Sequence, residues 1–500
     1  MNIKRCVILL CTVSMGLTLV LIWSLFFSGF LGLTRAASNT YTVCPTGPTT
    51  CDFNSIQSAV DAAADGDVIK VAEGTYTDVN HYDELAQVVY LDKSITIQGG
   101  YTTTNWTTPD PVTFPTTLDA GGQGRVLYIT GNVTPTIEGL YITGGEADGL
   151  GGYISYDSGG GVYIYEANAS IGHCTIINNN AGPASGAGNG LGGGIAAIAS
   201  YAHLENNHII NNTARWGGGA RVIYGAPLIR NNQFLSNNSL FGGGMYLMST
   251  EALVEDNLFQ DNTGERGGGI YLSGAEATIA GNVIRDNQGN YGGGIGINIG
   301  TSANVSGNLI LNNMVNNDGG GIYISYNDTR VHNNVIAHNQ APKSAGVYVT
   351  QASPIFRHNT IARNTGGDGM GVFVGPDATV ALTNTIIVSH TVGITVTAGS
   401  TATLGSTLWG TDTWANDTDW AGDGTIDTTA NLGGDPAFVD PDAGDYHIES
   451  GSAAYNAGVD AGVTMDFDYQ PRPYQAPDIG ADEHWPPGAL KTIYLPAIMR

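Results

Sequence analysis

The sequence of 500 residues has few charged side chains and very few basic ones. Charged residues make up 12% of the chain, and 18 Lys and Arg stand against 44 Asp and Glu, which gives a net charge of −26. No Lys or Arg occurs between Asn364 and Pro471. Such a surface repels nucleic acids and anionic membranes at long range and attracts divalent cations. The composition therefore excludes a nucleic-acid partner. It gives no reason to expect a cofactor other than Ca²⁺, which such a surface could bind.

The chain also lacks any long stretch with a helical repeat of apolar residues, because its 72 glycines interrupt every such window. Glycine is unfavourable inside helices, so a helical bundle is excluded. The glycines show no Gly-X-Y period, so a collagen-like triple helix is excluded as well.

Cysteine is scarce, with five residues in the whole chain. Cys6 and Cys11 lie in the N-terminal segment. Cys44 and Cys51 follow this segment closely, and outside the cytoplasm two such neighbours are expected to form a disulfide. Cys174 is left over, and we interpret it as a buried free thiol.

Residues 1–37 are typical of an export signal. Two basic residues precede an uncharged, mostly apolar run over residues 6–33, and Thr34 and Ala36 fit the small-residue positions of a cleavage site. The run is also long enough to span a bilayer, so a retained signal-anchor is the alternative to a cleaved signal peptide. In either case the rest of the chain is expected to be extracellular or at the cell surface. Membrane contact is then expected only through an uncleaved N-terminal segment.

Glycine triplets recur at a nearly constant step through the middle of the chain. From Gly192 onward the step is 25 residues every time but one, where it is 27. A constant step of this size is typical of a solenoid. The triplets and their two degenerate successors are Gly159–Gly161, Gly192–Gly194, Gly217–Gly219, Gly242–Gly244, Gly267–Gly269, Gly292–Gly294, Gly319–Gly321, Ser344–Gly346 and Gly369–Gly371.

Two columns of asparagine keep the same step. Stacked amides can hydrogen-bond along a stack of coils, and Asn tolerates the left-handed conformation that a tight corner needs. We therefore expect both columns at buried corners, with the second column fading at Asn364. The first column is Asn207, Asn232, Asn257, Asn282, Asn308, Asn334, Asn359 and Asn384. The second is Asn212, Asn237, Asn262, Asn287, Asn313, Asn339 and Asn364.

Apolar and outward-facing residues alternate after each triplet, as in Ile270-Tyr271-Leu272 and Ile322-Tyr323-Ile324. This period of two is typical of strands. Together with the repeat it predicts an all-β protein, a right-handed parallel β-helix with about 25 residues per coil. The exposed strands at the two ends of such a solenoid need covers.

The chain is accordingly divided into four regions. Residues 1–37 are the signal peptide or signal-anchor, and residues 38–430 are the β-helix. A short helix over residues 55–64, with Ser55 as its cap, is expected to cover the first coil. Residues 431–485 are expected to form a C-terminal cap, and residues 486–500 a linker and a short apolar tail.

Three segments carry a resemblance to known families. Residues 55–76 (SIQSAVDAAADGDVIKVAEGTY) and 95–99 resemble the opening of bacterial right-handed β-helix repeat proteins of the pectate-lyase-like superfamily. The repeat GGGI followed by F/I-x-x-N is similar to that of chlamydial polymorphic outer-membrane proteins. Residues 435–447 and 478–483 resemble the C-terminal region of surface β-helix proteins with anchor-type tails. The resemblance implies the fold, but one fold hosts many activities.

The sequence departs from those families where activity would reside. It lacks the Asn-Thr-Asp motif, the Asp pair and the Gly-His-Gly motif of the superfamily's polygalacturonases. It also lacks a terminal run of alternating strands of the kind that forms an autotransporter barrel. Neither the hydrolase activity nor barrel-mediated export is therefore carried over.

Two columns of mainly aromatic residues are the candidate binding site. Aromatic faces stack on the C–H faces of sugar rings, and long insertions at residues 145–158 and 181–190 lie beside the same face. The alternative reading is that these rings only stabilise the sheet through cross-strand pairing. The candidate substrate-binding residues are Trp216, Phe241, Arg266 and Tyr291 before the triplets, and Tyr246, Tyr271, Tyr323 and Tyr348 after them.

Two pairs of carboxylates are candidates for chemistry. Asp318 and Asp368 share a column two coils apart, about 9.6 Å at twice the strand spacing, near the wide limit for an inverting glycosidase. Lys343 lies between them, so a surface charge ladder is the alternative. Asp261 and Asp286 lie on adjacent coils and are the candidate Ca²⁺ ligands, with solvated neighbours as the alternative.

The sequence thus favours an exported or surface-attached, adhesin-like protein that binds polysaccharide or a glycosylated partner along an aromatic face. An enzyme is the second hypothesis, either a polysaccharide lyase or a glycoside hydrolase of the pectate-lyase-like type. That hypothesis needs catalytic groups, and Asp318 and Asp368 are its only candidates.

Overall fold

The computed structural model describes residues 38–47, 50–82, 85–184 and 188–486. The chain divides into two units, Met1–Asn39 and Thr40–Arg500, and the second contains the repeats. The predicted signal peptide or signal-anchor at residues 1–37 and nearly all of the predicted tail lie outside the described residues. In the part of the chain that is described, every helix is too short or too polar to cross a membrane.

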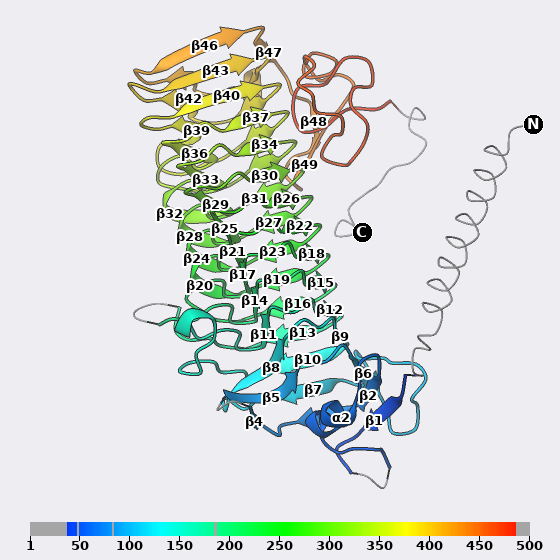
Figure 1. Cartoon of the computed structure of the whole chain (residues 1–500). Coiled ribbons are helices and arrows are strands. Elements are labelled where there is room, and N and C mark those ends of the chain that lie inside the picture. The colour runs from blue at the N-terminus through cyan, green and yellow to red at the C-terminus, as the bar shows by residue number, and fades with distance from the viewer. Residues whose placement is uncertain (1–37, 48–49, 83–84, 185–187, 487–500) are drawn as a thin grey trace, which may run out of the picture. The chain divides into compact units, whose positions relative to one another are not determined.

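Three long sheets run along the second unit, and each strand except β4 (Asn80–Tyr82) pairs with the equivalent strand of the next coil (Figure 1). Strand β4 forms an antiparallel pair with β5 (Leu85–Leu91). The pairing is parallel throughout the repeats, with about 25 residues per coil. Sheet 1 has 15 strands: β1 (Thr40–Val43), β2 (Val68–Ala72), β6 (Thr96–Tyr101), β9 (Thr136–Glu138), β12 (Ser170–Gly172), β15 (His203–Glu205), β18 (Leu228–Arg230), β22 (Leu253–Glu255), β26 (Thr278–Ala280), β30 (Asn304–Ser306), β34 (Arg330–His332), β37 (Ile355–Arg357), β40 (Thr379–Thr383), β43 (Thr401–Gly405) and β46 (Thr425–Thr429).

Sheets 2 and 3 have 14 strands each. Sheet 2 contains β3 (Gly74–Tyr76), β7 (Thr116–Asp119), β10 (Leu140–Thr143), β13 (Thr175–Ile177), β16 (His208–Ile210), β19 (Gln233–Leu235), β23 (Leu258–Gln260), β27 (Val283–Arg285), β31 (Leu309–Leu311), β35 (Val335–Ala337), β38 (Thr360–Ala362), β41 (Ile386–Val388), β44 (Leu408–Gly410) and β47 (Leu432–Gly434). Sheet 3 contains β4 (Asn80–Tyr82), β5 (Leu85–Leu91), β8 (Arg125–Thr130), β11 (Val162–Tyr165), β14 (Ile195–Ile198), β17 (Ala220–Ile223), β21 (Met245–Met248), β25 (Ile270–Ser273), β29 (Ile295–Asn298), β33 (Ile322–Ser325), β36 (Val347–Thr350), β39 (Met370–Val374), β42 (Val392–Val396) and β45 (Thr418–Ala421).

Smaller elements complete the fold. A four-stranded sheet 4 lies between sheets 2 and 3 in the middle coils, and it contains β20 (Asn238–Phe241), β24 (Thr263–Arg266), β28 (Gln288–Tyr291) and β32 (Met314–Asp318). An antiparallel pair follows the solenoid, β48 (Phe438–Asp440) and β49 (Asp445–Ile448). The helices are α2 (Ile56–Ala62) and the short 3₁₀ turns η1 (Tyr153–Ser155) and η2 (Asp412–Trp414).

The core is one apolar column inside the stack of coils. Ile270 and Leu272 of β25 point inward and are fully buried. Identical residues stack in register, as Phe234 and Phe259 do with ring centroids 4.6 Å apart. Burying each such side chain contributes roughly 1.5–3 kcal/mol, so the repeated strand pattern also supplies the main driving force of the fold.

Both asparagine columns form buried ladders. The backbone N and the Nδ2 of Asn257 both donate to Oδ1 of Asn282, and Asn282 does the same to Asn308, at 2.9–3.0 Å. The second ladder does not fade at Asn364, because His390 and Asn416 continue it. Each interior asparagine of a ladder thus satisfies two donors of one neighbouring coil. Asn384 does not extend the first ladder, because its Oδ1 accepts from the backbone N–H of Val459 and its Nδ2 faces Nε2 of His358.

The expected left-handed conformation of the ladder asparagines is wrong for the interior members. The positive φ belongs to the residue before each one, such as Asp256 before Asn257 (φ 53°) and Asp286 before Asn287 (φ 58°). The chain turns at that earlier residue, and the following amide is therefore directed into the buried corner.

The glycine triplets form the corner between sheets 4 and 3 for two reasons. The first glycine has a positive φ, which is 62° at Gly292. The second and third approach the next coil, where a Cβ on Gly293 would meet the carbonyl oxygen of Gly320 at 2.7 Å. A side chain at either kind of position is strained or crowded.

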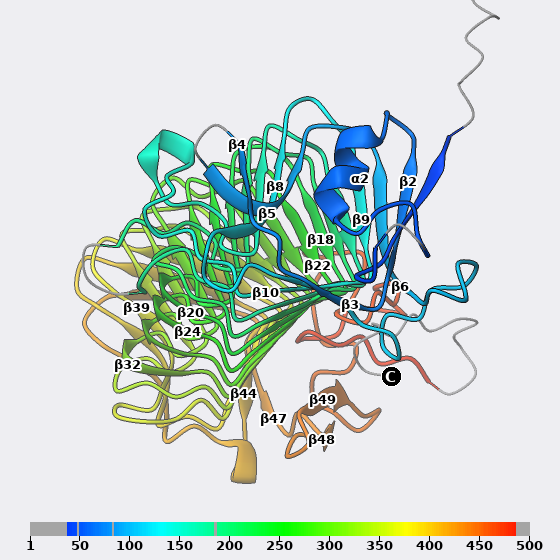
Figure 2. The same ribbon diagram turned by 90° about the horizontal axis from the view of Figure 1, so that it is seen from below.

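The N-terminal end of the solenoid is covered as expected. Helix α2 begins after Ser55, whose side chain accepts from the N–H of Ser58, and its apolar residues join the core column. Figure 2 shows α2 at this end of the stack. Cys44 and Cys51 form a disulfide beside it, and Cys174 is buried and free.

The C-terminal region does not cover the other end. Residues 435–486, which we call the lateral region, pack beside the solenoid on the outer face of sheet 2 (Figure 1). Phe438, Tyr446 and Ile448 contact outward residues of β31 to β44, including Leu309 and Ile386. We expected this region to cap the end of the solenoid, and that placement is wrong. The later coils of sheet 2 carry apolar residues on their outer face, and the region packs against them.

Candidate functional site

The column of residues before the triplets exists as expected from Leu191 to Lys343 and lies at the corner between sheets 4 and 3, whereas Asp368 has no pairing in register with Lys343 among the described residues. Successive members pair in register from coil to coil. This order places aromatic rings first, a cation in the middle and a carboxylate later. The column is Leu191, Trp216, Phe241, Arg266, Tyr291, Asp318 and Lys343.

The second column runs along sheet 3 beside the first, and its members also pair in register. The rings of Tyr323 and Tyr348 stack with centroids 5.1 Å apart, and Phe373 follows at 5.0 Å from Tyr348. Gly296 interrupts the column between Tyr271 and Tyr323. Gly296 thus divides the rings of this column into two groups, Tyr246 with Tyr271 and Tyr323 with Tyr348 and Phe373.

The expectation that this column is exposed is wrong for Tyr246 and Tyr271, which are 8% and 4% exposed. The guanidinium of the buried Arg221 lies 3.4 Å from the centre of the Tyr246 ring. The Phe241 ring lies 5.4 Å from that of Tyr271, which also leans over the space beside Gly296. These two tyrosines therefore support the surface from below and are not available for stacking.

The accessible part of the site consists of the remaining candidates. Trp216, Phe241, Tyr291, Tyr323 and Tyr348 are half-buried. Arg266 is exposed and lies between the two aromatic groups, 6.0 Å from the centre of the Phe241 ring and 5.5 Å from that of Tyr291. A cation beside aromatic faces adds a donor that the rings lack.

The insertion at residues 145–158 lies beside this surface as predicted. Tyr156 meets Trp216 edge to face, with centroids 5.4 Å apart. The buried Arg125 anchors the insertion by donating to the carbonyl oxygens of Ser158, at 2.6 Å, and of Gly151. Sequence reasoning missed Arg125, although an arginine opening an apolar strand is a signal of a buried polar anchor.

The candidate catalytic carboxylates differ in environment. Asp318 is half-buried, and burial is the main cause that raises its pKa, while Lys343 lowers it and Asp368 raises it. The Lys343 ammonium lies over the rings of Tyr348 and Phe373. Oδ1 of Asp368 accepts from the backbone N–H groups of Ser344 and Met370, so this carboxylate closes a corner of the backbone.

The candidate Ca²⁺ pair, Asp261 and Asp286, lies at adjacent corners of sheet 2. Asp286 is 3.8 Å from the Arg285 guanidinium, and its pKa is raised by burial and then by Asp261. Ca²⁺ takes six to eight oxygen ligands. Among the described residues these two carboxylates belong to no group of three acidic, His or Cys side chains that could hold a metal.

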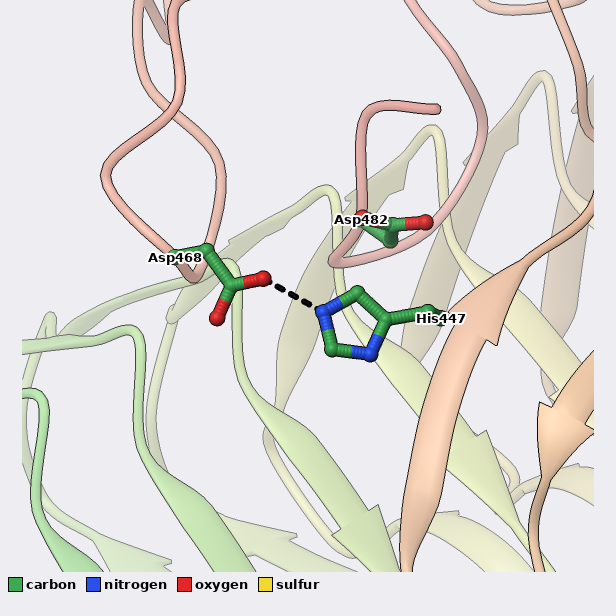
Figure 3. A group of neighbouring side chains, drawn as sticks. All are labelled: His447, Asp468 and Asp482. Atoms are coloured by element: carbon green, nitrogen blue, oxygen red, sulfur yellow. Dashed lines mark hydrogen bonds and ion pairs between the residues drawn. The ribbon is translucent and has the colours of Figure 1, made fainter. Parts of the chain in front are cut away.

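One such group does occur in the described part of the chain, in the lateral region: His447, Asp468 and Asp482 (Figure 3). Both imidazole nitrogens of His447 already face carboxylates, Nδ1 that of Asp445 at 2.5 Å and Nε2 that of Asp468. Burial acts to lower the pKa of His447, but Asp468 and Asp482 raise it to about 10. The imidazolium is therefore the cation of this cluster, and a metal would have to displace its proton.

More buried carboxylates surround the cluster. Burial raises the pKa of Asp466 to about 8 and that of Asp478 to about 7. Glu483 pairs with the fully buried Arg472 at 3.2 Å. Sequence reasoning did not identify this network, although Arg472 ends a long stretch without any basic residue and has aspartates on both sides.

Comparison with known proteins identifies the repeats. A sequence family described as "Right handed beta helix region" matches residues 118–265, 193–336 and 266–407. No curated protein sequence matches the chain.

Solved structures similar to the chain share little sequence with it. One is pectate lyase Pel9A, with 12% identity over 90% of this chain and 98% of that chain and a TM-score of 0.25. Another is the A-module of the mannuronan C-5 epimerase AlgE6 of Azotobacter vinelandii, with 14% identity, 76% and 94% coverage and a TM-score of 0.29. A third is a mannuronic acid specific polysaccharide family 6 lyase from human gut microbiota, with 12% identity, 64% and 86% coverage and a TM-score of 0.28.

Proposed function

Because the chain belongs to the right-handed β-helix family, and its solenoid carries an aromatic face, we propose that it binds a polysaccharide or a glycosylated partner along that face. The protein acts outside the cytoplasm, secreted or attached at the cell surface. The observation that carries the proposal is the accessible row of Trp216, Phe241, Tyr291, Tyr323 and Tyr348, with Arg266 between its two groups.

The geometry of the row suits a linear ligand. Coils follow one another about every 4.8 Å, so a chain lying along the solenoid axis meets a new side chain at each coil. Rings stack on the C–H faces of sugars, and the tyrosine hydroxyls and Arg266 supply hydrogen bonds to hydroxyl or carboxyl groups. The buried Tyr246 and Tyr271 pack against the accessible ring of Phe241.

Binding of the protein to a glycan array, followed by calorimetry on the best glycans, tests the proposal. Substituting Trp216, Tyr291 and Tyr323 together by alanine should weaken binding at least about tenfold, since stacked aromatic anchors carry much of the energy of such sites. Tyr141→Ala on sheet 2 is the matched control, because Tyr141 is an exposed outward tyrosine far from this corner in the coil. If the triple variant binds glycans as tightly as the parent protein, or if the parent binds none, the proposal is wrong.

A polysaccharide lyase or glycoside hydrolase is the second candidate, and Asp318 favours it. A half-buried carboxylate with a raised pKa beside Lys343 has the character of a general acid or base. Reducing-sugar release and absorbance of unsaturated products, with and without Ca²⁺, measure turnover over a polysaccharide panel. If the protein turns over a polysaccharide and Asp318→Asn abolishes that turnover, catalysis replaces binding as the proposed function.

A further inference from the structure

A pocket of about 360 Å³ lies on sheet 1, where the lateral region meets the solenoid. The ends of β30, β34 and β37 form one wall, and residues 462–469 of the lateral region form the other. Nδ2 of Asn333 donates to the carbonyl oxygen of Met465 at 2.6 Å and ties the two walls together. The pocket is therefore built from two segments far apart in the sequence and lies on a different sheet from the aromatic face.

Three basic side chains converge on this pocket. Ser306, His332 and Arg357 occupy equivalent positions on successive strands and follow one another in register. Arg330 lies two residues before His332 and shares its outward face, because Val331 between them points into the core. All three basic residues line the pocket.

Neither arginine has a hydrogen-bond or ion-pair partner for its guanidinium among the described residues. In the described part of the chain Arg266 and Lys343 also form no ion pair, but their charges lie over aromatic rings. Arg230 occupies the same column as Arg357, and it pairs at 3.0 Å with Glu205 on the neighbouring strand. Its other neighbour in the column is Glu255, whereas Arg357 lies between His332 and Thr383, neither of which is acidic.

Other groups in the pocket also lack partners in the described part of the chain. Nδ1 of His332 and Oδ1 of Asn333 are buried without a hydrogen bond. Burial, and then the charge of Arg357, lower the pKa of His332, so the neutral ring can present an N–H to a ligand. Buried polar atoms without partners cost free energy, which a ligand that pairs with them recovers.

Asp466 also lines the pocket but does not neutralise the arginines. Its Oδ1 accepts from the backbone N–H groups of Asp468 and Gln470, and its Oδ2 accepts from that of Glu483. It forms no ion pair with Arg330 or Arg357 among the described residues, and two guanidinium groups stand against its one carboxyl group. The pocket therefore keeps an excess of positive charge.

We infer that this pocket binds an oxyanion, either free or as the phosphate, sulfate or carboxylate group of a larger ligand, between the guanidinium groups of Arg330 and Arg357. Guanidinium groups bind such anions through paired N–H donors in a planar fork. The imidazole of His332 and the hydroxyl groups of Thr464 and Tyr469 line the remaining wall. The inference does not depend on the proposed glycan binding.

Isothermal titration of the full chain with inorganic phosphate, sulfate and acetate at constant ionic strength tests the inference. Saturable binding of at least one anion is expected, and the three arms show which oxyanion the pocket prefers. The double variant Arg330→Gln, Arg357→Gln should bind at least about tenfold more weakly, since each charged hydrogen bond contributes more than a factor of ten. Arg230→Gln is the matched control and should bind like the parent.

A second variant keeps both arginines. Thr383→Glu places a carboxylate on the strand after Arg357, as Glu255 lies on the strand after Arg230, and should compete with the anion and weaken binding. Hydrogen exchange of residues 300–360 confirms that each variant is folded. If the parent shows no saturable binding, if both variants bind like the parent, or if Arg230→Gln weakens binding equally, the inference is wrong.

Discussion

The solenoid and the lateral region satisfy their buried polar groups in opposite ways. In the solenoid, neutral amides such as Asn257 and Asn282 bond to the next coil, and the same bond recurs from coil to coil as far as Asn359. In the lateral region, five buried carboxylates surround Arg472 and the imidazolium of His447. A repeat can satisfy each polar group with its own copy, whereas a region that occurs once must combine different charged groups.

The largest expected effect follows from removing the central cation of the lateral region. Arg472→Met leaves Glu483 and the neighbouring carboxylates without their positive partner, and breaking a buried ion pair on one side costs about 3–5 kcal/mol. Hydrogen exchange resolved by segment should show lost protection in residues 435–486 and little change in residues 195–300, because solenoid coils contact only their neighbours.

The matched control for this change is Arg230→Met, which removes an exposed ion pair with Glu205. Such pairs contribute at most about 1 kcal/mol, so the control should leave both regions protected. Uniform loss of protection along the whole chain in Arg472→Met would show that the two regions are not energetically separate.

The two regions are also expected to respond to pH in opposite directions. Burial lowers the pKa of His390 in the ladder to about 4, from an ordinary value of 6.5. The unfolded chain takes up this proton first, so stability of that part of the solenoid is present above 6.5 and is lost as pH falls toward 4. The full loss is about 3 kcal/mol.

The carboxyl of Asp466 in the lateral region behaves in the reverse way. Burial raises its pKa from an ordinary 3.8 to about 8, so the folded state holds a proton that the unfolded state has released. Stability of this region is therefore greatest below 3.8 and falls as pH rises through 8. Asp478, with a pKa raised by burial to about 7, acts in the same direction.

Segment-resolved hydrogen exchange at several pH values, corrected for intrinsic exchange rates, measures both trends. His390→Asn is the matched variant, because an amide continues the ladder without titrating, and it should remove the acid-induced loss near residues 364–416 alone. If both regions lose protection as the pH falls, or both as it rises, the predicted opposite response is wrong.

The most local of these effects is expected from a single ladder position. Asn282→Leu removes the acceptor of two donors on Asn257, and each unsatisfied buried group costs about 1–3 kcal/mol. Limited proteolysis should then cut within residues 255–310. Asn316→Leu is the control, because Asn316 is exposed on β32, and it should change protection little. Unchanged protection in Asn282→Leu would mean that the stacked amides do not stabilise the coils.

Much of the candidate site was predicted from the sequence, because its order follows the repeat. The register of Trp216, Phe241, Arg266 and Tyr291 follows from a constant step, and the structure has that register. The burial of Tyr271 was not predicted, since it depends on the missing side chain of Gly296 on the next coil and on the ring of Phe241.

By itself the sequence determined the fold class, the length of a coil, the ladders and the helix that covers the first coil. These features repeat or are local, so residues close in sequence, or one period apart, carry all the information. The tertiary structure alone decided that the lateral region packs on sheet 2, that Arg472 and His447 balance buried carboxylates, and that Arg330 and Arg357 face residues 462–469. Those contacts join segments that share no period, some of them more than a hundred residues apart, and burial and charge there depend on how the segments pack.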